Sequence, residues 1–313
     1  MAGGAPYPTG WQNGRLVPSN QVSIPLLAPG VSFAAAVFEG VRGYRQADGT
    51  VALFRLPEHL ERLVYSARLL GLEDLPDPDM LTQALHRMLS RDAVTEDCYI
   101  RLHVHVDGSG DMSAIGPLGV AMVARPRPQL TQRLEQGLRC QVSSWRRIGD
   151  NASPPRAKAA ANYLNSRLAA IQARADGYDT AILLTESGHV AEGPGSCLFM
   201  VRDGVLLTPG VTSGILESIT RDTVLRLARA SGLFADVIER DIDRTELHAA
   251  SEVLMVGTGM EITPVVGVDR LAVAEGARGP LTQALQDRYF TLVRGGVTAP
   301  AGWLDPITYE LET

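Results

Sequence analysis

The pattern of apolar and polar residues along the chain predicts strands and helices that mix without strict alternation. Residues 51–56 (VALFRL) alternate as a half-buried strand does, and apolar residues then recur at helical spacing from Leu60 to Leu70. Pro57 lies at the first position of this helix, and Gly71 follows its last turn. The same criteria predict further helices at about 79–91, 159–176, 218–233 and 279–295.

Short apolar runs predict the strands, and one polar segment predicts a domain boundary. Residues 1–20 are rich in Gly and Pro and are expected to be irregular, with an edge strand at most. Strands are expected at 21–28, 31–45, 51–56, 98–106, 119–124, 137–144, 179–185, 189–191, 197–201, 205–207, 237–241, 252–256 and 263–266. The segment RPRPQLTQ is polar and interrupted by prolines. The sequence therefore predicts an α/β (α+β) protein with a domain at 1–124, an interdomain loop at 125–132 and a second domain at 133–313.

Composition and charge argue against several classes of protein. The 313 residues are 45% hydrophobic and 20% charged, which is ordinary for a globular protein. A net charge of −6 argues against general nucleic-acid binding, and no apolar run approaches the ~18 residues of a membrane span. The N-terminus lacks the pattern of a secretory signal. Cys98, Cys140 and Cys197 contain no CxxC pair, so we expect no disulfide framework, no structural zinc and a cytoplasmic location.

Lys158 is the single Lys among 29 basic residues. One explanation is a mutational bias toward Arg that left one Lys behind. The other is chemistry that Arg cannot perform, because a Lys amine can lose its proton and attack a carbonyl whereas Arg stays protonated. Composition alone leaves both explanations open.

Several common catalytic motifs are absent from the sequence. There is no Walker A loop, no GxGxxG after a strand, no HExxH and no GxSxG. His103 and His105 share one face of a predicted strand, but no third ligand lies nearby in the sequence. We therefore expect no metal site.

Four segments besides that of Lys158 contain groups that a carbonyl cofactor would need. Glu192 lies at a strand end before a tight turn, where its carboxylate would suit a ring nitrogen. The helix start at Ile219-Thr220 and the turn Gly257-Thr258-Gly259 would offer N–H groups to a phosphate, and Arg55 would add a charge. Taken singly, each of the four also has an ordinary explanation: a surface hairpin, a helix end, a turn and a solvated Arg, respectively. Together, amine, ring-nitrogen partner and phosphate cradle describe pyridoxal phosphate.

The sequence resembles the class IV (fold-type IV) aminotransferases, and most closely the branched-chain amino acid aminotransferases. The matching blocks occur in the family's order and cover roughly residues 20–295. They are VFEGVRGY (37–44), LFRLPEHLERL (53–63), YIRLHV (99–104), AKAAANYLNS (157–166), GYDTAILL (177–184), VAEGPG (190–195), GVLLTPGVTSGILESITRD (204–222), ELHAASEVLMVGTGMEITPV (246–265) and GPLTQALQDRYF (279–290).

The resemblance implies a fold, a cofactor and a role for each matched residue. It implies a small α/β domain, a larger β-barrel-like domain with flanking helices, pyridoxal 5'-phosphate between them, and a homodimer or higher homo-oligomer. Lys158 would be the catalytic residue and form the Schiff base, Glu192 would pair with the ring nitrogen, and Tyr163 would reach the phenolic oxygen. The residues expected to hold the phosphate are Arg55, Ile219, Thr220 and Thr258.

The resemblance also implies a reaction and its substrates. Phe38, Tyr99 and Arg101 would line the substrate pocket, and the turn at Gly259 would meet the α-carboxylate. The expected activity is ping-pong transfer of an amino group between a branched-chain or other apolar L-amino acid and 2-oxoglutarate. Alternatives within the fold are an (R)-amine or D-amino acid transaminase or an aminodeoxychorismate-type lyase. A non-catalytic cofactor carrier and a cofactor-free aldolase are alternatives from other classes.

The chain departs from the family's pattern at four points. Ser32-Phe33 replaces an aromatic pair such as His-Tyr, and the interdomain loop at 125–132 lacks an aromatic residue. Cys197 stands where the family has Asn, and Ser218 replaces a Gly at a helix start. The first two departures fall where the family recognises its substrate.

Overall fold

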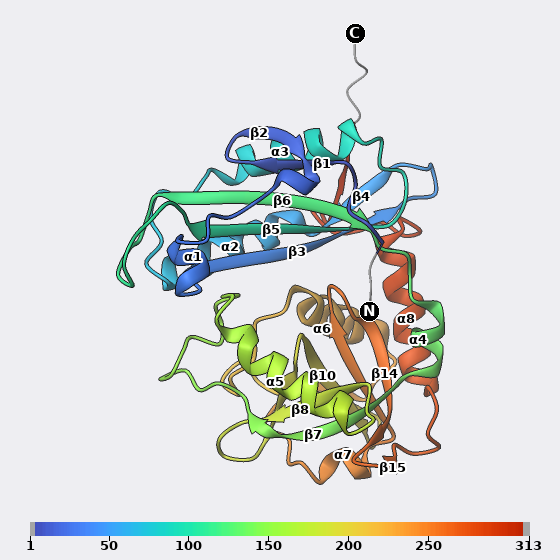
Figure 1. Cartoon of the computed structure of the whole chain (residues 1–313). Coiled ribbons are helices and arrows are strands. Elements are labelled where there is room, and N and C mark those ends of the chain that lie inside the picture. The colour runs from blue at the N-terminus through green and yellow to red at the C-terminus, as the bar shows by residue number, and fades with distance from the viewer. Residues whose placement is uncertain (1–3, 309–313) are drawn as a thin grey trace. The chain divides into compact units, whose positions relative to one another are not determined.

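The computed structural model describes residues 4–308, which form two compact units (Figure 1). The first, here called the N-terminal unit, runs to Gln129 and includes Ala157–Ala161 and the chain from Thr291 onward. The second, the barrel unit, consists of Leu130–Arg156 and Asn162–Phe290. Two segments that the sequence suggested for the second domain thus lie in the first unit. The predicted domain limits stay a prediction.

A seven-stranded sheet forms the centre of the N-terminal unit. Its order is β16-β4-β3-β5-β6-β1-β2. The strands are β1 (Thr9–Gln12), β2 (Arg15–Pro18), β3 (Ala36–Arg45), β4 (Val51–Phe54), β5 (Cys98–Val106), β6 (Leu118–Pro126) and β16 (Leu304–Pro306). All pairings within it are antiparallel. The strand β16, from the far end of the chain, therefore completes the edge beside β4.

Two helices supply the apolar side chains that pack into the core of this sheet. They are α2 (Leu56–Leu69) and α3 (Pro78–Arg91). Both have Pro in the first turn, and Asp77 caps α3 by accepting a hydrogen bond from the Asp79 N–H. Their buried residues recur at helical spacing, for example Leu60 and Leu63 on α2, and join the strand residues in one core.

The barrel unit contains a closed ring of strands. The chain of pairings runs β10-β13-β14-β7-β8-β9, and β9 pairs back to β10, which closes the ring. The strands are β7 (Leu138–Arg146), β8 (Thr180–Leu184), β9 (Val190–Gly193), β10 (Ser196–Arg202), β13 (Glu252–Gly257) and β14 (Glu261–Val268), with β11 (Val205–Thr208), β12 (Asp236–Glu239) and β15 (Leu271–Ala272) added outside the ring. Closure leaves these ring strands without an open edge. The mixed α/β class with a β-barrel is confirmed.

Five helices accompany the barrel strands. They are α4 (Thr131–Gln136), α5 (Asn162–Ala175), α6 (Ile219–Ser231), α7 (Glu246–Ala249) and α8 (Pro280–Val293). Apolar residues from the barrel strands, among them Ile182, Leu198 and Met255, are fully buried and form one core. No helix within residues 4–308 is long and apolar enough to cross a membrane.

Three local predictions were wrong. Residues 21–28 form no strand, because Pro25 and Pro29 remove N–H donors that a sheet would need. Residue 21 ends a 3-10 turn, η1 (Ser19–Gln21), and residues 22–28 lead into the short helix α1 (Pro29–Ser32). The segment near the N-terminus forms two real strands, β1 and β2. The helix expected from 159 begins only at Asn162, because Ala159 pairs with Val37 of β3 instead.

Candidate active site

The backbone of Lys158 is fixed on both sides within the N-terminal unit. On β3, strand β4 pairs with Gly43–Arg45 alone. The earlier part of the same edge of β3 is therefore available to residues 157–161. The Lys158 carbonyl accepts a hydrogen bond from the Phe38 N–H at 3.1 Å, and its own N–H donates to Ser66 Oγ on α2 at 2.9 Å. The single Lys is therefore presented by a short bridge rather than by a helix.

Behind this bridge, a buried charge cluster ties α2 to β3. Arg62 Nε and Nη2 donate to the two carboxylate oxygens of Glu39 at 2.7 and 2.8 Å, and His59 Nδ1 lies 2.7 Å from Oε2. A carboxylate only accepts, so His59 Nδ1 is the donor. Burial alone would raise the pKa of Glu39, but Arg62 and His59 outweigh it and hold that pKa well below its usual range. Burial lowers the pKa of His59, so this histidine is neutral at pH 7.

The predicted substrate residues gather on the other face of the same sheet. Alternation along β5 places Tyr99, Arg101 and His103 on one face, and His103 pairs with Phe38 of β3. The Arg101 guanidinium lies 3.5 Å from the centroid of the Phe38 ring, and Lys158 Nζ lies 5.0 Å from it. The structure thus brings Lys158, Phe38 and Arg101 together.

The Tyr99 side chain lies over Gly40, a diagonal neighbour on β3 that pairs with Arg101. A Cβ atom at Gly40 would overlap the Tyr99 hydroxyl and ring. The requirement for glycine in the block VFEGVRGY is therefore steric at this position. Burial, followed by the charge of Arg101, lowers the pKa of His103 to about 4, so this histidine adds no positive charge to the face at neutral pH.

Arg55, the predicted phosphate residue of this unit, is buried rather than solvated. It is the N-cap residue of α2 and has a left-handed conformation (φ 55°, ψ 41°), which is uncommon for a residue other than glycine. Its Nε donates to Glu58 Oε1 at 2.7 Å, and its guanidinium lies 4.3 Å from the centroid of the Trp303 ring. These two contacts fix the side chain at the start of α2.

In the barrel unit, Glu192 lies in β9 and is almost fully buried. Arg147 Nε lies 2.9 Å from Glu192 Oε1, and the Leu216 N–H donates to Oε2 at 3.1 Å. The thiol of Cys197, which pairs with Glu192 across β9 and β10, lies 3.8 Å from Oε2. An arginine and an amide donor both favour the charged carboxylate. Sequence reasoning found Glu192 but missed Arg147 and Leu216.

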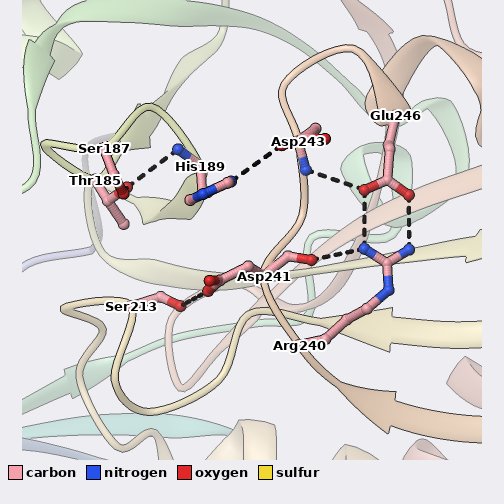
Figure 2. Close-up of polar contacts among 8 residues, drawn as sticks. All are labelled: Thr185, Ser187, His189, Ser213, Arg240, Asp241, Asp243 and Glu246. Carbon is pink, nitrogen blue, oxygen red and sulfur yellow. Dashed lines mark hydrogen bonds and ion pairs between the residues drawn. The ribbon is translucent and has the colours of Figure 1, made fainter.

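A network of polar contacts (Figure 2) holds the residues just before β9, the strand that contains Glu192, and the loop that begins at Ser213 and continues to Leu216. His189 Nδ1, just before β9, lies 3.1 Å from Asp243 Oδ1, and the His189 backbone N–H donates to Thr185 Oγ1 at 3.1 Å. Ser213 Oγ donates to Asp241 Oδ1 at 3.0 Å, which holds the loop that carries Leu216. The same network continues through two hydrogen bonds from the guanidinium of Arg240 to the carboxylate of Glu246.

The predicted phosphate residues of the barrel unit lie at a helix start and at a tight turn. Ser218 caps α6 by accepting from the Arg221 N–H, so Ile219 and Thr220 are its first two residues. The turn after β13 is closed by the Met260 N–H donating to the Gly257 carbonyl, with Thr258 and Gly259 at its tip. Tyr163 is the second residue of α5.

The groups present fit pyridoxal phosphate. Taken by itself, the N-terminal unit contains an amine and a buried Arg. The barrel unit, also taken by itself, contains a buried carboxylate and a helix start of the kind that binds phosphate. In addition, the buried Ser196 hydroxyl has no hydrogen-bond partner among the described residues and lies close to Gly193. It is a further donor that the sequence did not indicate.

Comparisons with known proteins agree with this chemistry. The family model described as amino-transferase class IV matches residues 36–268. The branched-chain-amino-acid aminotransferase of Salmonella typhimurium is 38% identical over 303 residues, which is 95% of this chain and 96% of that protein. The solved PLP form of the Thermobaculum terrenum branched-chain amino acid aminotransferase is 40% identical, with a TM-score of 0.90 over 97% of this chain and 99% of that one. The branched-chain aminotransferase of Thermoproteus uzoniensis, solved with norvaline, is 37% identical, with a TM-score of 0.90 over 96% and 99%.

Proposed function

Because the chain belongs to the class IV aminotransferases, we propose that it transfers amino groups between branched-chain or other apolar L-amino acids and 2-oxoglutarate. The predicted family and the assignment as a pyridoxal-phosphate-dependent aminotransferase are confirmed. The relatives' shared name favours the branched-chain activity over the (R)-amine, D-amino acid and lyase alternatives.

The observation that carries the proposal is the placement of Lys158 against Phe38 and Arg101. Lys158 Nζ lies 5.0 Å from the Phe38 ring centroid, and the Arg101 guanidinium lies over the same ring. An amine able to gain and lose a proton thus lies next to an apolar surface and a fixed positive charge. An apolar substrate side chain would pack on Phe38, whereas a second carboxylate would pair with Arg101.

Each residue has a defined task in this proposal. When bound, pyridoxal phosphate supplies a carbonyl carbon that takes up the amino group and a ring that withdraws electrons. Lys158 would remove the proton from the substrate α-carbon and, within the same half-reaction, return it to the carbon that carried the carbonyl group. Glu192 holds the ring nitrogen's proton, and Tyr163 binds the phenolic oxygen. The phosphate is assigned to Arg55, Ile219, Thr220 and Thr258.

The two substrates are proposed to use one pocket in turn, which gives ping-pong kinetics. The pocket residues are Phe38, Tyr99 and Arg101, with the turn at Thr258-Gly259 binding the α-carboxylate that all substrates share. Arg101 then distinguishes glutamate and 2-oxoglutarate from the apolar substrates by their second carboxylate.

We also propose a homodimer, or a higher homo-oligomer, in the cytoplasm. The three cysteines are buried and form no disulfide within residues 4–308, which agrees with a compartment that keeps thiols reduced. Size-exclusion chromatography with light scattering tests the oligomeric state, and a monomer that is fully active would contradict it.

Borohydride reduction tests the role of Lys158 directly. The purified holoenzyme should lose its visible absorption band on reduction, and the cofactor label should be found on the peptide that contains Lys158. The variant Lys158→Arg should carry no label and show no transamination. Full activity of that variant, or a label elsewhere, would overturn the assignment.

A substrate panel tests the proposed specificity. L-Leucine, L-valine, L-isoleucine and L-glutamate should each convert the cofactor's absorption, with 2-oxoglutarate reversing the change. D-Alanine and (R)-1-phenylethylamine should do so far more slowly. Faster conversion by the last two would overturn the substrate class and leave the cofactor chemistry intact.

A further inference from the structure

Arg147 makes a buried contact that the proposed reaction does not yet explain. Its side chain is 5% exposed, and its Nε lies 2.9 Å from Glu192 Oε1 and 3.0 Å from the Gly214 carbonyl. The Nε–H thus donates to a backbone carbonyl, while the guanidinium forms an ion pair with the carboxylate. Both partners lie within the barrel unit.

The local fold directs this side chain inward. The pairing of β7 with β8 shifts its register between Val142 and Arg146, and the Arg147 N–H then donates to the Leu184 carbonyl at 2.8 Å. Arg146 is exposed, whereas Arg147 is buried. Adjacent arginines therefore face different environments.

The acceptor loop is also specialised. Gly214 has φ +67°, a conformation that favours glycine, and this glycine packs close to the stem of Arg147. Ser213 is tied to Asp241 in the network of Figure 2, and Leu216 of the same loop donates to Glu192. One loop thus holds both the arginine and the carboxylate.

The charge of Arg147 matters because Glu192 is buried. A buried carboxylate that loses its cationic partner takes up a proton instead of remaining charged. A protonated Glu192 no longer attracts a proton on a ring nitrogen. The thiol of Cys197 and the Leu216 amide contact Oε2 but carry no positive charge.

We propose that Arg147 is a positioning residue for the aminotransferase reaction: it keeps Glu192 charged and oriented, and through Glu192 it keeps the ring nitrogen of pyridoxal phosphate protonated. This inference rests on the proposed function, since it requires Glu192 to be the partner of the ring nitrogen. Arg147 itself performs no proton transfer.

The test compares the affinity for pyridoxal phosphate and the absorption spectrum in two backgrounds. Arg147→Gln in the otherwise unchanged enzyme should weaken cofactor binding about 10- to 100-fold, by analogy with the loss of a residue that orients a metal ligand, and should shift the visible band. In the Glu192→Gln background, the same change should alter the affinity less than about twofold, because no charge is left to hold. Arg146→Gln removes the neighbouring exposed charge and serves as the matched control, with no effect in either background.

Three outcomes would overturn the inference. Equal losses in both backgrounds would mean that Arg147 acts through the fold alone. An unchanged affinity and spectrum in Arg147→Gln would mean that Glu192 needs no cation. If Arg147→Met bound the cofactor as tightly as the unchanged enzyme, only the packing of the side chain at position 147 would matter, and not its charge. If Arg147→Gln does not fold, Arg147→Lys is carried through the same two backgrounds. This variant keeps the charge but loses the Nε–H that donates to the Gly214 carbonyl. It should give a smaller loss that again disappears beside Glu192→Gln.

Failure of the proposed function gives a different result. The titration needs no amino donor, so it separates cofactor binding from substrate choice. If the unchanged protein does not bind pyridoxal phosphate, the proposed function fails. If it binds the cofactor normally and only the comparison of backgrounds fails, the role of Arg147 is wrong and the aminotransferase assignment stands.

Discussion

Glu39→Gln should destabilise the N-terminal unit strongly, although the Glu39 carboxylate is assigned no contact with a substrate. The carboxylate is fully buried and accepts two hydrogen bonds from Arg62 and one from His59, all between 2.7 and 2.8 Å. Glutamine keeps the volume and one acceptor oxygen but removes the charge. Arg62 then remains nearly buried without its counter-ion, and breaking such a pair costs roughly 3–5 kcal/mol. That is a large part of a typical stability of about 5–15 kcal/mol.

Urea unfolding at fixed protein concentration measures this change in the free energy of unfolding. Glu61→Gln makes the same substitution at an exposed position of the same helix and should have little effect. The double variant Glu39→Gln, Arg62→Met should recover part of the loss, since it removes the unpaired cation. A loss below about 1 kcal/mol in Glu39→Gln would refute the reasoning, since it would place the pair in a far more polar environment than its burial implies.

The same cluster predicts how stability depends on pH. The pKa of Glu39 is lowered in the folded state, so its contribution is present above its unfolded pKa of about 4.3 and is lost as the pH falls below that value. The pKa of His59 is also lowered, so the folded state binds fewer protons near pH 6 and stability decreases on acidification there too. Unfolding curves between pH 4.5 and pH 2 should therefore show a steeper loss for the unchanged protein than for Glu39→Gln. Parallel curves would contradict this assignment.

Three further predictions concern the active site. Arg101→Leu should slow the half-reaction with 2-oxoglutarate by about 10- to 100-fold, because it removes a charged hydrogen bond of about 1.5–3 kcal/mol. The half-reaction with leucine should stay closer to normal. Single-turnover spectra measure each half-reaction, and equal losses would show that Arg101 binds the shared carboxylate. Gly40→Ala should displace Tyr99, whose hydroxyl occupies the space of the new Cβ, and raise KM for bulky donors in steady-state assays, whereas an unchanged KM would mean that Tyr99 is not in the pocket. Glu192→Gln should slow α-proton removal roughly 30- to 1000-fold, which corresponds to a loss of ~2–4 kcal/mol. Stopped-flow measurements with α-deuterated leucine report the rate of this step. Near-normal rates would mean that another group supports the ring.

The parts of the fold that follow from local pattern were predictable from the sequence. The helix after Phe54 was indicated by Pro57 and by apolar residues at helical spacing, and it is observed as α2. The strand carrying Tyr99 and Arg101 was predicted at 98–106, and the structure gives the same limits. In both, the signal is the period of burial, which the sequence contains in full. The strand predicted at 21–28 does not form, because these apolar residues have no strand edge to pair with and the prolines lack the N–H groups that pairing needs.

The candidate chemistry was predictable where one residue type is required, and its supports were not. Lys158 and Glu192 were proposed from the sequence because few side chains can act as a nucleophilic amine or as a carboxylate partner of a ring nitrogen, and their roles stay predictions. Arg147 is one of many arginines in the sequence, and only the register shift in β7 buries it against Glu192, 45 positions further along the chain. Ser66 likewise has no signature, because its role is one hydrogen bond to a backbone amide.

The position of Lys158 in the chain explains why such supports matter to the reaction. Residues 157–161 belong to the N-terminal unit although the chain on both sides of them belongs to the barrel unit. A helix that began at 159, as its alanines suggest, would remove the backbone contacts with Phe38 and Val37. In place of helical hydrogen bonds, the segment makes bonds to the edge of β3 and one bond to Ser66 of α2. The bond to Ser66 depends on how α2 is held against β3. A substitution in the Glu39 cluster should therefore change the position of the Lys158 amine by displacing the backbone of Lys158, even though no side chain of that cluster is assigned a step in the chemistry.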